Sequence, residues 1–390
     1  MDTLTRHRKI WRLLYRPISF WLRRKLNYTP EICRVEGPCL VVPNHVTAWD
    51  PLLVALSFPD NQMYFVASEH IFRWGLLTKL IEWLVAPIPR RKGASGTDTV
   101  MTCIRRIRKG ASIGLFAGGD CSWNGRSSQV FPATGKLARA CGATLVTYRL
   151  EGGYLSAPRW GKGVRRGAMR GHVVQIYVPE QLKAMTADEV NAAINRDIYE
   201  DAWQRQAAEH AVFAGKSPAE HIECLLYACP GCGQVGGLTS QGAYIRCRCG
   251  FSRRFTETGT FAPDEPFRNP GEWDAWQRQR LLSLRPGEGG ELFSDSGMIL
   301  TEILSGHRTR AVGTGIMRQY SERLLCGGEN FPLSEISGMS IHGAQTLTFS
   351  FRDRYYEVSS KSPRCLRKYL DIWEDYTRRY ASSCGETPKI

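Results

Sequence analysis

LVVPNHVTAWDPLLVAL, residues 40–56, decides the fold of the first half of the chain. The apolar run that stops at Pro43 is typical of a buried strand, and the apolar residues after Asp50 are typical of a helix. A strand that leads directly into a helix predicts an open α/β sheet. In such sheets functional side chains gather at the carboxyl ends of the strands, which is where His45 falls.

His45 and Asp50 are five residues apart, which is not a same-face spacing on a helix. If the chain turns sharply after His45, the carboxylate of Asp50 can fold back to the imidazole. It would then fix the tautomer and favour the imidazolium that forms when His45 takes a proton. We therefore predict a catalytic pair. The alternative is a histidine at the start of a helix and an aspartate that the helix dipole favours in the first turn.

This stretch resembles the N-H-x4-D signature of the glycerolipid acyltransferases, the family of lysophosphatidate (1-acylglycerol-3-phosphate) acyltransferases. Four ordered blocks carry the resemblance over roughly residues 10–215. It implies a glycerolipid acyltransferase-like α/β sheet domain, which we place at residues 28–215. It also implies an O-acyltransferase of phospholipid synthesis or remodelling. His45 would take the proton from a lysophospholipid hydroxyl as that hydroxyl attacks the thioester of acyl-CoA or acyl carrier protein. The implied acceptor is 1-acylglycerol-3-phosphate and the product phosphatidate, with no covalent intermediate and no catalytic metal.

The second block of the family is an apolar strand that ends in an arginine, and Arg90 takes this place by resemblance, with Arg91 beside it. Prolines before Arg90 keep this segment extended. In the family this arginine contacts the glycerol phosphate, and its planar guanidinium suits phosphate oxygens. The alternative is a solvated basic loop.

The third block, Phe-Pro-Glu-Gly-Thr-Arg-Ser in the family, is matched only in part. Phe116, Gly119 and Ser122 are in register, but Ala117, Gly118 and Cys121 replace the proline, the glutamate and the arginine. This departure puts the acceptor in question more than acyl transfer itself. Cys121 is not predicted as a nucleophile, because the family transfers the acyl group directly and no neighbour in the sequence looks like its base.

We add further substrate-binding candidates to Arg90 and Arg91. They are Gly119, Ser122, Arg126 and Lys136. Arg126 is the cation that would replace the missing arginine of the third block, with Asp120 as a replacement acid. Lys136 would contact a phosphate of donor or acceptor, or else be a solvated cation on a helix.

Residues 1–27 predict two short basic amphipathic helices, separated at Pro17. The apolar side of the first consists of Ile10, Trp11, Leu14, Tyr15 and Ile18. Aromatic residues opposite positive charge are typical of helices that lie in an anionic lipid interface. The alternative is a helix packed on the domain with a solvated basic face.

The net charge of +15 at pH 7 fits nucleic acid, an anionic membrane surface or phosphorylated ligands equally well. The chain does not open on a secretion signal, and no apolar run reaches about 18 residues. We therefore expect a cytoplasmic protein, peripheral on the cytoplasmic face of the membrane.

Two short cysteine pairs, Cys229 with Cys232 and Cys247 with Cys249, predict a zinc ribbon within residues 220–260. Four thiolates at this spacing suit one tetrahedral, structural Zn²⁺. Free thiols or disulfides are the alternatives. With 13 cysteines, an odd number, a disulfide-stabilised secreted protein is disfavoured.

The last part of the chain, residues 285–385, is predicted to form several short strands followed by an amphipathic helix over 363–380. This order resembles a pleckstrin-homology-like domain in architecture only. Before it, we expect a long helix from the capping box at Thr186 to about Ala214, and a linker beyond Pro263 that holds Trp273.

A different class of function is a catalytically silent acyltransferase-like scaffold whose zinc ribbon and β domain bind a protein or a nucleic acid. The altered third block and the positive charge favour it. The intact His45 and Asp50 favour the enzyme, and the ribbon lacks the cluster of cations and aromatic residues that stacks on bases. We therefore expect an enzyme that does not bind nucleic acid.

Overall fold

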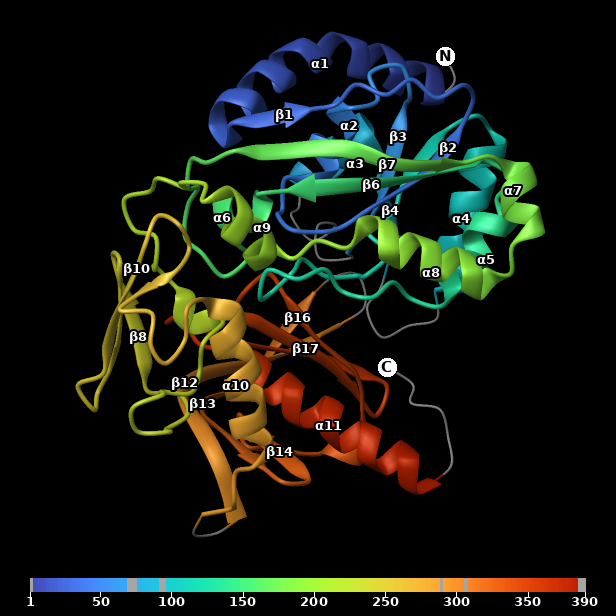
Figure 1. Cartoon of the computed structure of the whole chain (residues 1–390). Coiled ribbons are helices and arrows are strands. Elements are labelled where there is room, and N and C mark those ends of the chain that lie inside the picture. The colour runs from blue at the N-terminus through green and yellow to red at the C-terminus, as the bar shows by residue number, and fades with distance from the viewer. Residues whose placement is uncertain (1–2, 69–75, 91–95, 288–289, 305–307, 385–390) are drawn as a thin grey trace. The chain divides into compact units, whose positions relative to one another are not determined.

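The computed structural model describes residues 3–68, 76–90, 96–287, 290–304 and 308–384 (Figure 1). The chain divides into two compact units, the first ending at Gly215 and the second beginning at Lys216. The short segment Trp160–Lys162 belongs to the second unit. None of the helices in the described ranges combines the length and the apolar character that crossing a bilayer requires.

A seven-stranded sheet in the order β1-β7-β6-β2-β5-β3-β4 forms the centre of the first unit (Figure 1). Its strands are β1 (Tyr28–Pro30), β2 (Cys39–Pro43), β3 (Met63–Ser68), β4 (Ile88–Arg90), β5 (Ser112–Gly114), β6 (Thr144–Glu151) and β7 (Met169–Tyr177). The five strands from β6 to β4 are parallel, whereas β7 is antiparallel to β6 and parallel to β1. The predicted α/β domain with a parallel sheet is therefore confirmed.

Helices cover both faces of this sheet. They are α1 (Thr3–Leu26), α2 (Asp50–Leu56), α3 (Leu76–Val85), α4 (Thr97–Arg108), α5 (Ala133–Ala140), α6 (Gly153–Ser156), α7 (Pro179–Ala184), α8 (Ala187–Ile198) and α9 (Ala202–Glu209). In β2, Cys39 and Val41 point into a core shared with α1 and α2. Leu40 and Val42 point into a second core shared with α4, α5 and α8. Both faces of β2 are buried, which explains why its sequence is a continuous apolar run.

The prediction of two N-terminal helices is wrong, because α1 continues through Pro17. Proline removes the N–H that would donate to the carbonyl of Leu13. Leu13 is 77% exposed, so water can satisfy that carbonyl. Trp11 and Tyr15 before the proline, and Leu22 after it, pack on the core and hold the helix together.

The long helix expected from Thr186 to Ala214 is also wrong in its length. The predicted capping box is present, since the Thr186 hydroxyl accepts from the Glu189 N–H at the start of α8. However, α8 ends at Ile198, and Asp201 begins α9 by accepting from the N–H groups of Trp203 and Gln204. A strong N-cap inside the predicted helix divides it into two.

The second unit contains two sheets. A small antiparallel sheet in the order β11-β10-β9-β8 is formed by β8 (Leu238–Gln241), β9 (Tyr244–Cys247), β10 (Ser252–Phe255) and β11 (Phe261–Ala262). The helix α10 (Pro270–Leu282) follows it and buries Trp273, so the predicted linker at Trp273 is wrong. A second seven-stranded sheet, in the order β15-β14-β13-β12-β18-β17-β16, precedes the last helix, α11 (Arg367–Cys384).

All pairs in this larger sheet are antiparallel. Its strands are β12 (Glu291–Ile303), β13 (Thr309–Tyr320), β14 (Arg323–Cys326), β15 (Glu329–Pro332), β16 (Ile336–His342), β17 (Thr346–Phe351) and β18 (Arg354–Ser360). The predicted β-rich region with a terminal helix is therefore present. Strands β13 and β15 were not predicted, because most residues of β13 are not buried and Phe331 is the one buried residue of β15. Neither strand shows the apolar alternation that predicts strands.

Candidate active site

The turn between β2 and α2 is held in place by Asn44, which lies directly after the strand. The Asn44 side chain donates to the carbonyl of Leu150 in β6 at 2.9 Å and accepts from the Leu150 N–H at 2.7 Å. These two bonds continue the β2–β6 pairing beyond the end of β2. The next residue, His45, is thereby fixed at the carboxyl edge of the sheet.

Asp50 is the first residue of α2 and is completely buried. Its Oδ2 accepts from the N–H groups of Val46 and Thr47 at 2.6 and 2.9 Å. Its Oδ1 accepts from the Thr47 hydroxyl at 2.6 Å. The carboxylate therefore organises the turn, and the turn brings it back to His45, as predicted from the sequence.

His45 lies between Asp50 and Cys121. Its Nδ1 is 2.8 Å from Oδ2 of Asp50, and its Nε2 is 3.3 Å from Sγ of Cys121. The imidazole stacks on Phe116 with ring centroids 4.1 Å apart. Burial lowers the pKa of His45, but the Cys121 sulfur and the Asp50 carboxylate beside the ring outweigh this effect and raise the pKa to about 10. The arrangement can hold or pass on a proton at Nε2.

The loop after β5 places Cys121 there. The Ser122 N–H donates to the His45 carbonyl at 2.8 Å, which ties this loop to the turn after β2. The Ser122 hydroxyl donates to the Arg126 carbonyl at 2.8 Å and accepts from the Gly125 N–H at 3.0 Å. Ser122 is buried, with an exposed fraction of 3%. The structure thus gives Ser122 a role in shaping the loop.

The other predicted substrate residues have different surroundings. Gly119 has a φ of +80°, and a Cβ there would approach the Phe131 ring to 2.8 Å, so the loop requires glycine. The Arg126 guanidinium pairs with Asp201 at 2.8 Å, at the start of α9. Lys136 is exposed on α5. Arg91 lies outside the described residues.

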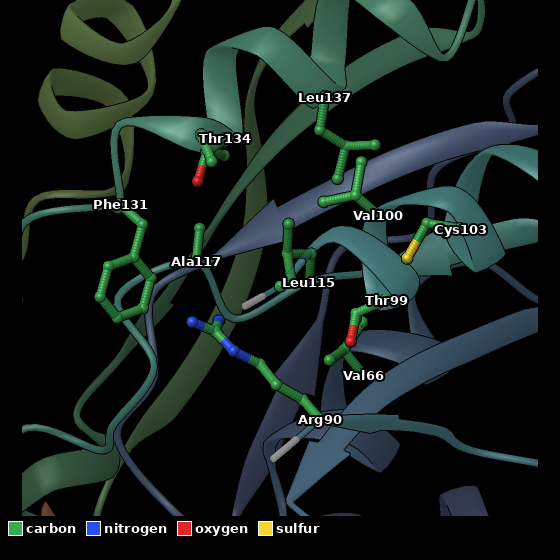
Figure 2. Close-up of a pocket in the computed structure, with 12 residues that line it drawn as sticks. Val66, Arg90, Thr99, Val100, Cys103, Leu115, Ala117, Phe131, Thr134 and Leu137 are labelled. Carbon is green, nitrogen blue, oxygen red and sulfur yellow. The ribbon is translucent and has the colours of Figure 1, made fainter. Parts of the chain in front are cut away.

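Arg90, at the end of β4, reaches into a mainly apolar pocket between α4, the segment that follows β5, and α5 (Figure 2). The pocket is lined by Val66, Arg90, Gly96, Thr99, Val100, Cys103, Leu115, Ala117, Phe131, Ala133, Thr134 and Leu137. The Arg90 guanidinium lies over the Phe131 ring, 4.6 Å from its centroid. Burial lowers the pKa of Arg90, and Asp120 opposes this effect.

Arg159 lies close to these residues, although no pattern in the sequence predicted it there. Its guanidinium lies 3.6 Å from the Asp120 carboxylate and donates to the Cys121 carbonyl at 3.3 Å. It also covers the Trp123 ring at 4.0 Å, and its side chain is only 8% exposed. In the sequence, Arg159 begins a basic loop. No motif there distinguishes a loop that lines a site from a loop that is exposed to solvent.

The predicted cysteine ligands come together in the second unit. The sulfur atoms of Cys229, Cys232, Cys247 and Cys249 all lie within 4.8 Å of one another. The Cys229–Cys249 and Cys232–Cys247 sulfur pairs are 3.7 and 3.8 Å apart. A tetrahedral zinc with Zn–S bonds of about 2.3 Å separates its sulfurs by about 3.8 Å. The donor set and its spacing therefore fit a zinc ion.

Comparison with known proteins finds a family similarity within the first unit. Residues 24–151 match the family model described as Acyltransferase, a range that includes His45, Asp50, Arg90 and Cys121. This match supports the acyltransferase family for this part of the chain. Among solved structures, the 1-acyl-sn-glycerophosphate (LPA) acyltransferase PlsC from Thermotoga maritima aligns with 16% identity and a TM-score of 0.39, over 50% of this chain and 78% of that chain.

Proposed function

We propose that the first unit transfers a fatty acyl group from an acyl thioester to the hydroxyl of a lysophospholipid. The observation that carries this proposal is the His45–Asp50 pair, 2.8 Å apart, inside the segment that matches the Acyltransferase family model. The donor is acyl-CoA or acyl carrier protein. The acceptor is 1-acylglycerol-3-phosphate, which yields phosphatidate.

In this reaction the neutral form of His45, which the raised pKa makes the minor form near pH 7, accepts the proton of the attacking hydroxyl at Nε2. The Asp50 carboxylate is hydrogen-bonded to Nδ1, so Nε2 is the nitrogen left to accept the proton. The same carboxylate stabilises the imidazolium as it forms. A positioned base of this kind contributes about 10²–10⁴ in rate.

We propose that two guanidinium groups bind the acceptor phosphate. Arg90 reaches into the pocket, and Arg159 lies beside Cys121 with a side chain that is largely buried. Asp120 carries a negative charge near both of them, so we expect phosphate binding to be weaker than two unopposed arginines would give. The apolar wall of the pocket suits the hydrocarbon part of a lipid.

We further propose that α1 attaches the enzyme to an anionic membrane surface. Trp11 and Tyr15, predicted to face lipid, instead pack on the core. The exposed apolar residues of α1 are Leu13, Phe20 and Trp21, at 77%, 66% and 46%. They lie among the arginines of the same helix, which is the combination that anionic lipid interfaces favour. Attachment on the cytoplasmic face remains part of this proposal.

The four cysteines of the second unit are proposed to bind a structural Zn²⁺ that stabilises the small sheet β8–β11. A closed site of four thiolates supplies folding free energy and leaves no position open for catalysis. The division into residues 1–27, 28–215, 220–260 and 285–385, with a pleckstrin-homology-like last domain, stays a proposal. The pleckstrin-homology likeness rests on the order of strands and helix.

The proposed function is tested by acyl transfer from labelled palmitoyl-CoA and palmitoyl-acyl carrier protein to a panel of lysophospholipids, in vesicles that contain anionic lipid. We expect transfer, with 1-acylglycerol-3-phosphate as the preferred acceptor. Transfer to acceptors without a phosphate monoester at equal rates would contradict the proposed roles of Arg90 and Arg159. Absence of transfer with either donor would favour the catalytically silent scaffold.

A further inference from the structure

The sulfur of Cys121 lies next to Nε2 of His45, the nitrogen that would accept a proton in the proposed reaction. Its Sγ is 3.3 Å from Nε2 of His45, and Nδ1 of the same ring is 2.8 Å from Asp50. Thiol, imidazole and carboxylate thus form a continuous chain, which is the arrangement that activates a nucleophile. The reason for excluding Cys121 in the sequence analysis, that no base is near, is therefore wrong.

This position has a consequence for direct transfer. An acceptor hydroxyl that gives its proton to His45 must come within hydrogen-bond distance of Nε2. The Cys121 sulfur occupies that distance already, and Asp50 holds the other nitrogen. A direct attack on the donor therefore requires the thiol to leave this position, whereas an attack by the thiol itself requires no rearrangement.

The surroundings of Cys121 favour a reactive sulfur over a structural one. Burial raises the pKa of Cys39 and of Cys103 to about 11, which keeps these thiols neutral and inert. Cys121 is only partly buried and has a histidine at its sulfur. The guanidinium of Arg159 donates to its carbonyl and adds positive charge close by.

We propose that Cys121 is the nucleophile of a two-step transfer and carries the acyl group as a thioester between donor and acceptor. This inference rests on the proposed function, since it concerns the same donor and acceptor. It changes the order of events, because the acyl group leaves the donor before the acceptor hydroxyl reacts.

In the first step Sγ of Cys121 attacks the carbonyl carbon of the donor thioester while Nε2 of His45 takes the thiol proton. The new S–C bond forms, the donor C–S bond breaks, and the donor sulfur leaves as a thiol with the proton from His45. One thioester replaces another, so the step needs no further reactant.

In the second step the acylated sulfur, which has no proton to share with Nε2, moves away from it. The acceptor hydroxyl then attacks the carbonyl carbon of the acyl-Cys121 thioester, and Nε2 of His45 takes the hydroxyl proton. The O–C bond forms and the Sγ–C bond breaks. The sulfur of Cys121 then recovers a proton from His45. The same nitrogen serves both steps, with Asp50 stabilising the imidazolium each time.

The test is a pair of measurements on the full chain with ¹⁴C-palmitoyl-CoA. Without acceptor, intact-mass analysis and peptide mapping should find one palmitoyl group on Cys121, released by neutral hydroxylamine and reduced at least tenfold in His45→Ala. With the preferred acceptor, Cys121→Ala should lower kcat at least 100-fold. Cys33→Ala removes another partly buried cysteine, one outside the Cys121–His45–Asp50 chain, and should keep the wild-type rate.

The outcomes separate this inference from the proposed function. Wild-type transfer that persists in a folded Cys121→Ala variant overturns the covalent step and leaves the proposed function standing. A Cys121 adduct that no lysophospholipid discharges supports the covalent step and overturns the proposed acceptor. Neither adduct nor transfer, with palmitoyl-acyl carrier protein also tried, overturns both. Thermal unfolding of each variant shows whether it is folded.

Discussion

Replacing Asp50 by asparagine or by alanine separates the charge of this residue from its role in the turn. In Asp50→Asn, the amide oxygen can take the place of Oδ2 and keep the bonds from Val46, Thr47 and His45, while the new NH₂ group donates to the Thr47 hydroxyl. The hydrogen-bonded turn then survives and the negative charge is lost. In Asp50→Ala, both are lost.

The magnitudes follow from these contacts. A charge-assisted hydrogen bond contributes about 1.5–3 kcal/mol, which is about 10- to 150-fold in rate when it acts on the transition state. We expect Asp50→Asn to lose this factor in kcat with little change in stability. Asp50→Ala leaves the N–H groups of Val46 and Thr47 buried without their acceptor, at a cost of about 1–3 kcal/mol each. Its free energy of unfolding should fall by about 2–6 kcal/mol.

The assays are acyl transfer to the preferred lysophospholipid and urea denaturation of each variant. Asp197 provides a matched control, because it is also buried and accepts from the hydroxyls of Thr147 and Tyr177 at 3.0 and 2.7 Å. Asp197→Ala should destabilise the fold without lowering the rate of the folded enzyme. An Asp50→Asn variant within twofold of the wild-type rate would refute the assigned charge role. Equal stability of the two Asp50 variants would refute the assigned structural role.

Four further results are expected. Arg90→Lys should raise KM for the phosphate acceptor about tenfold with little change in kcat, because lysine lacks the planar fork, and steady-state kinetics with and without a phosphate on the acceptor measure this. Cys247→Ser, or a strong chelator, should release about one equivalent of Zn²⁺ and lower the unfolding temperature, as metal analysis and calorimetry would show. Leu13→Ser with Phe20→Ser should weaken sedimentation with anionic vesicles at least fivefold without changing the unfolding temperature, because both side chains are exposed. The pKa of His45 is raised from 6.5 to about 10 in the folded protein, so the protonated ring stabilises the fold fully below pH 6.5 and this stabilisation is lost as the pH approaches 10. Urea denaturation should therefore show the wild type losing stability relative to His45→Gln between pH 6.5 and 10.

The predictions that succeeded depend on short stretches of sequence. His45 and Asp50 meet because one turn joins a strand to a helix, so the four residues between them contain the needed information. The continuous apolar run of β2 likewise identifies a strand that is buried on both faces. The four cysteines come together through two short knuckles whose spacing is itself the signal.

The features that were missed depend on contacts between distant segments. Cys121 reaches His45 from 76 residues away, because the Ser122 N–H binds the His45 carbonyl. Arg126 was predicted to face the substrate, but Asp201, at the start of a helix that the sequence analysis did not separate, binds its guanidinium. Arg159 has no motif around it, and only the folded chain brings it to Cys121. Pairings of this kind have no local pattern from which to predict them.

The most direct test of acyl transfer at His45 compares wild type with His45→Ala, using labelled palmitoyl-CoA and 1-acylglycerol-3-phosphate in anionic vesicles. We predict phosphatidate formation by the wild type and a loss of at least 100-fold in His45→Ala, with both proteins folded by circular dichroism. Equal phosphatidate formation by the two proteins would contradict the assignment of His45 as the catalytic base.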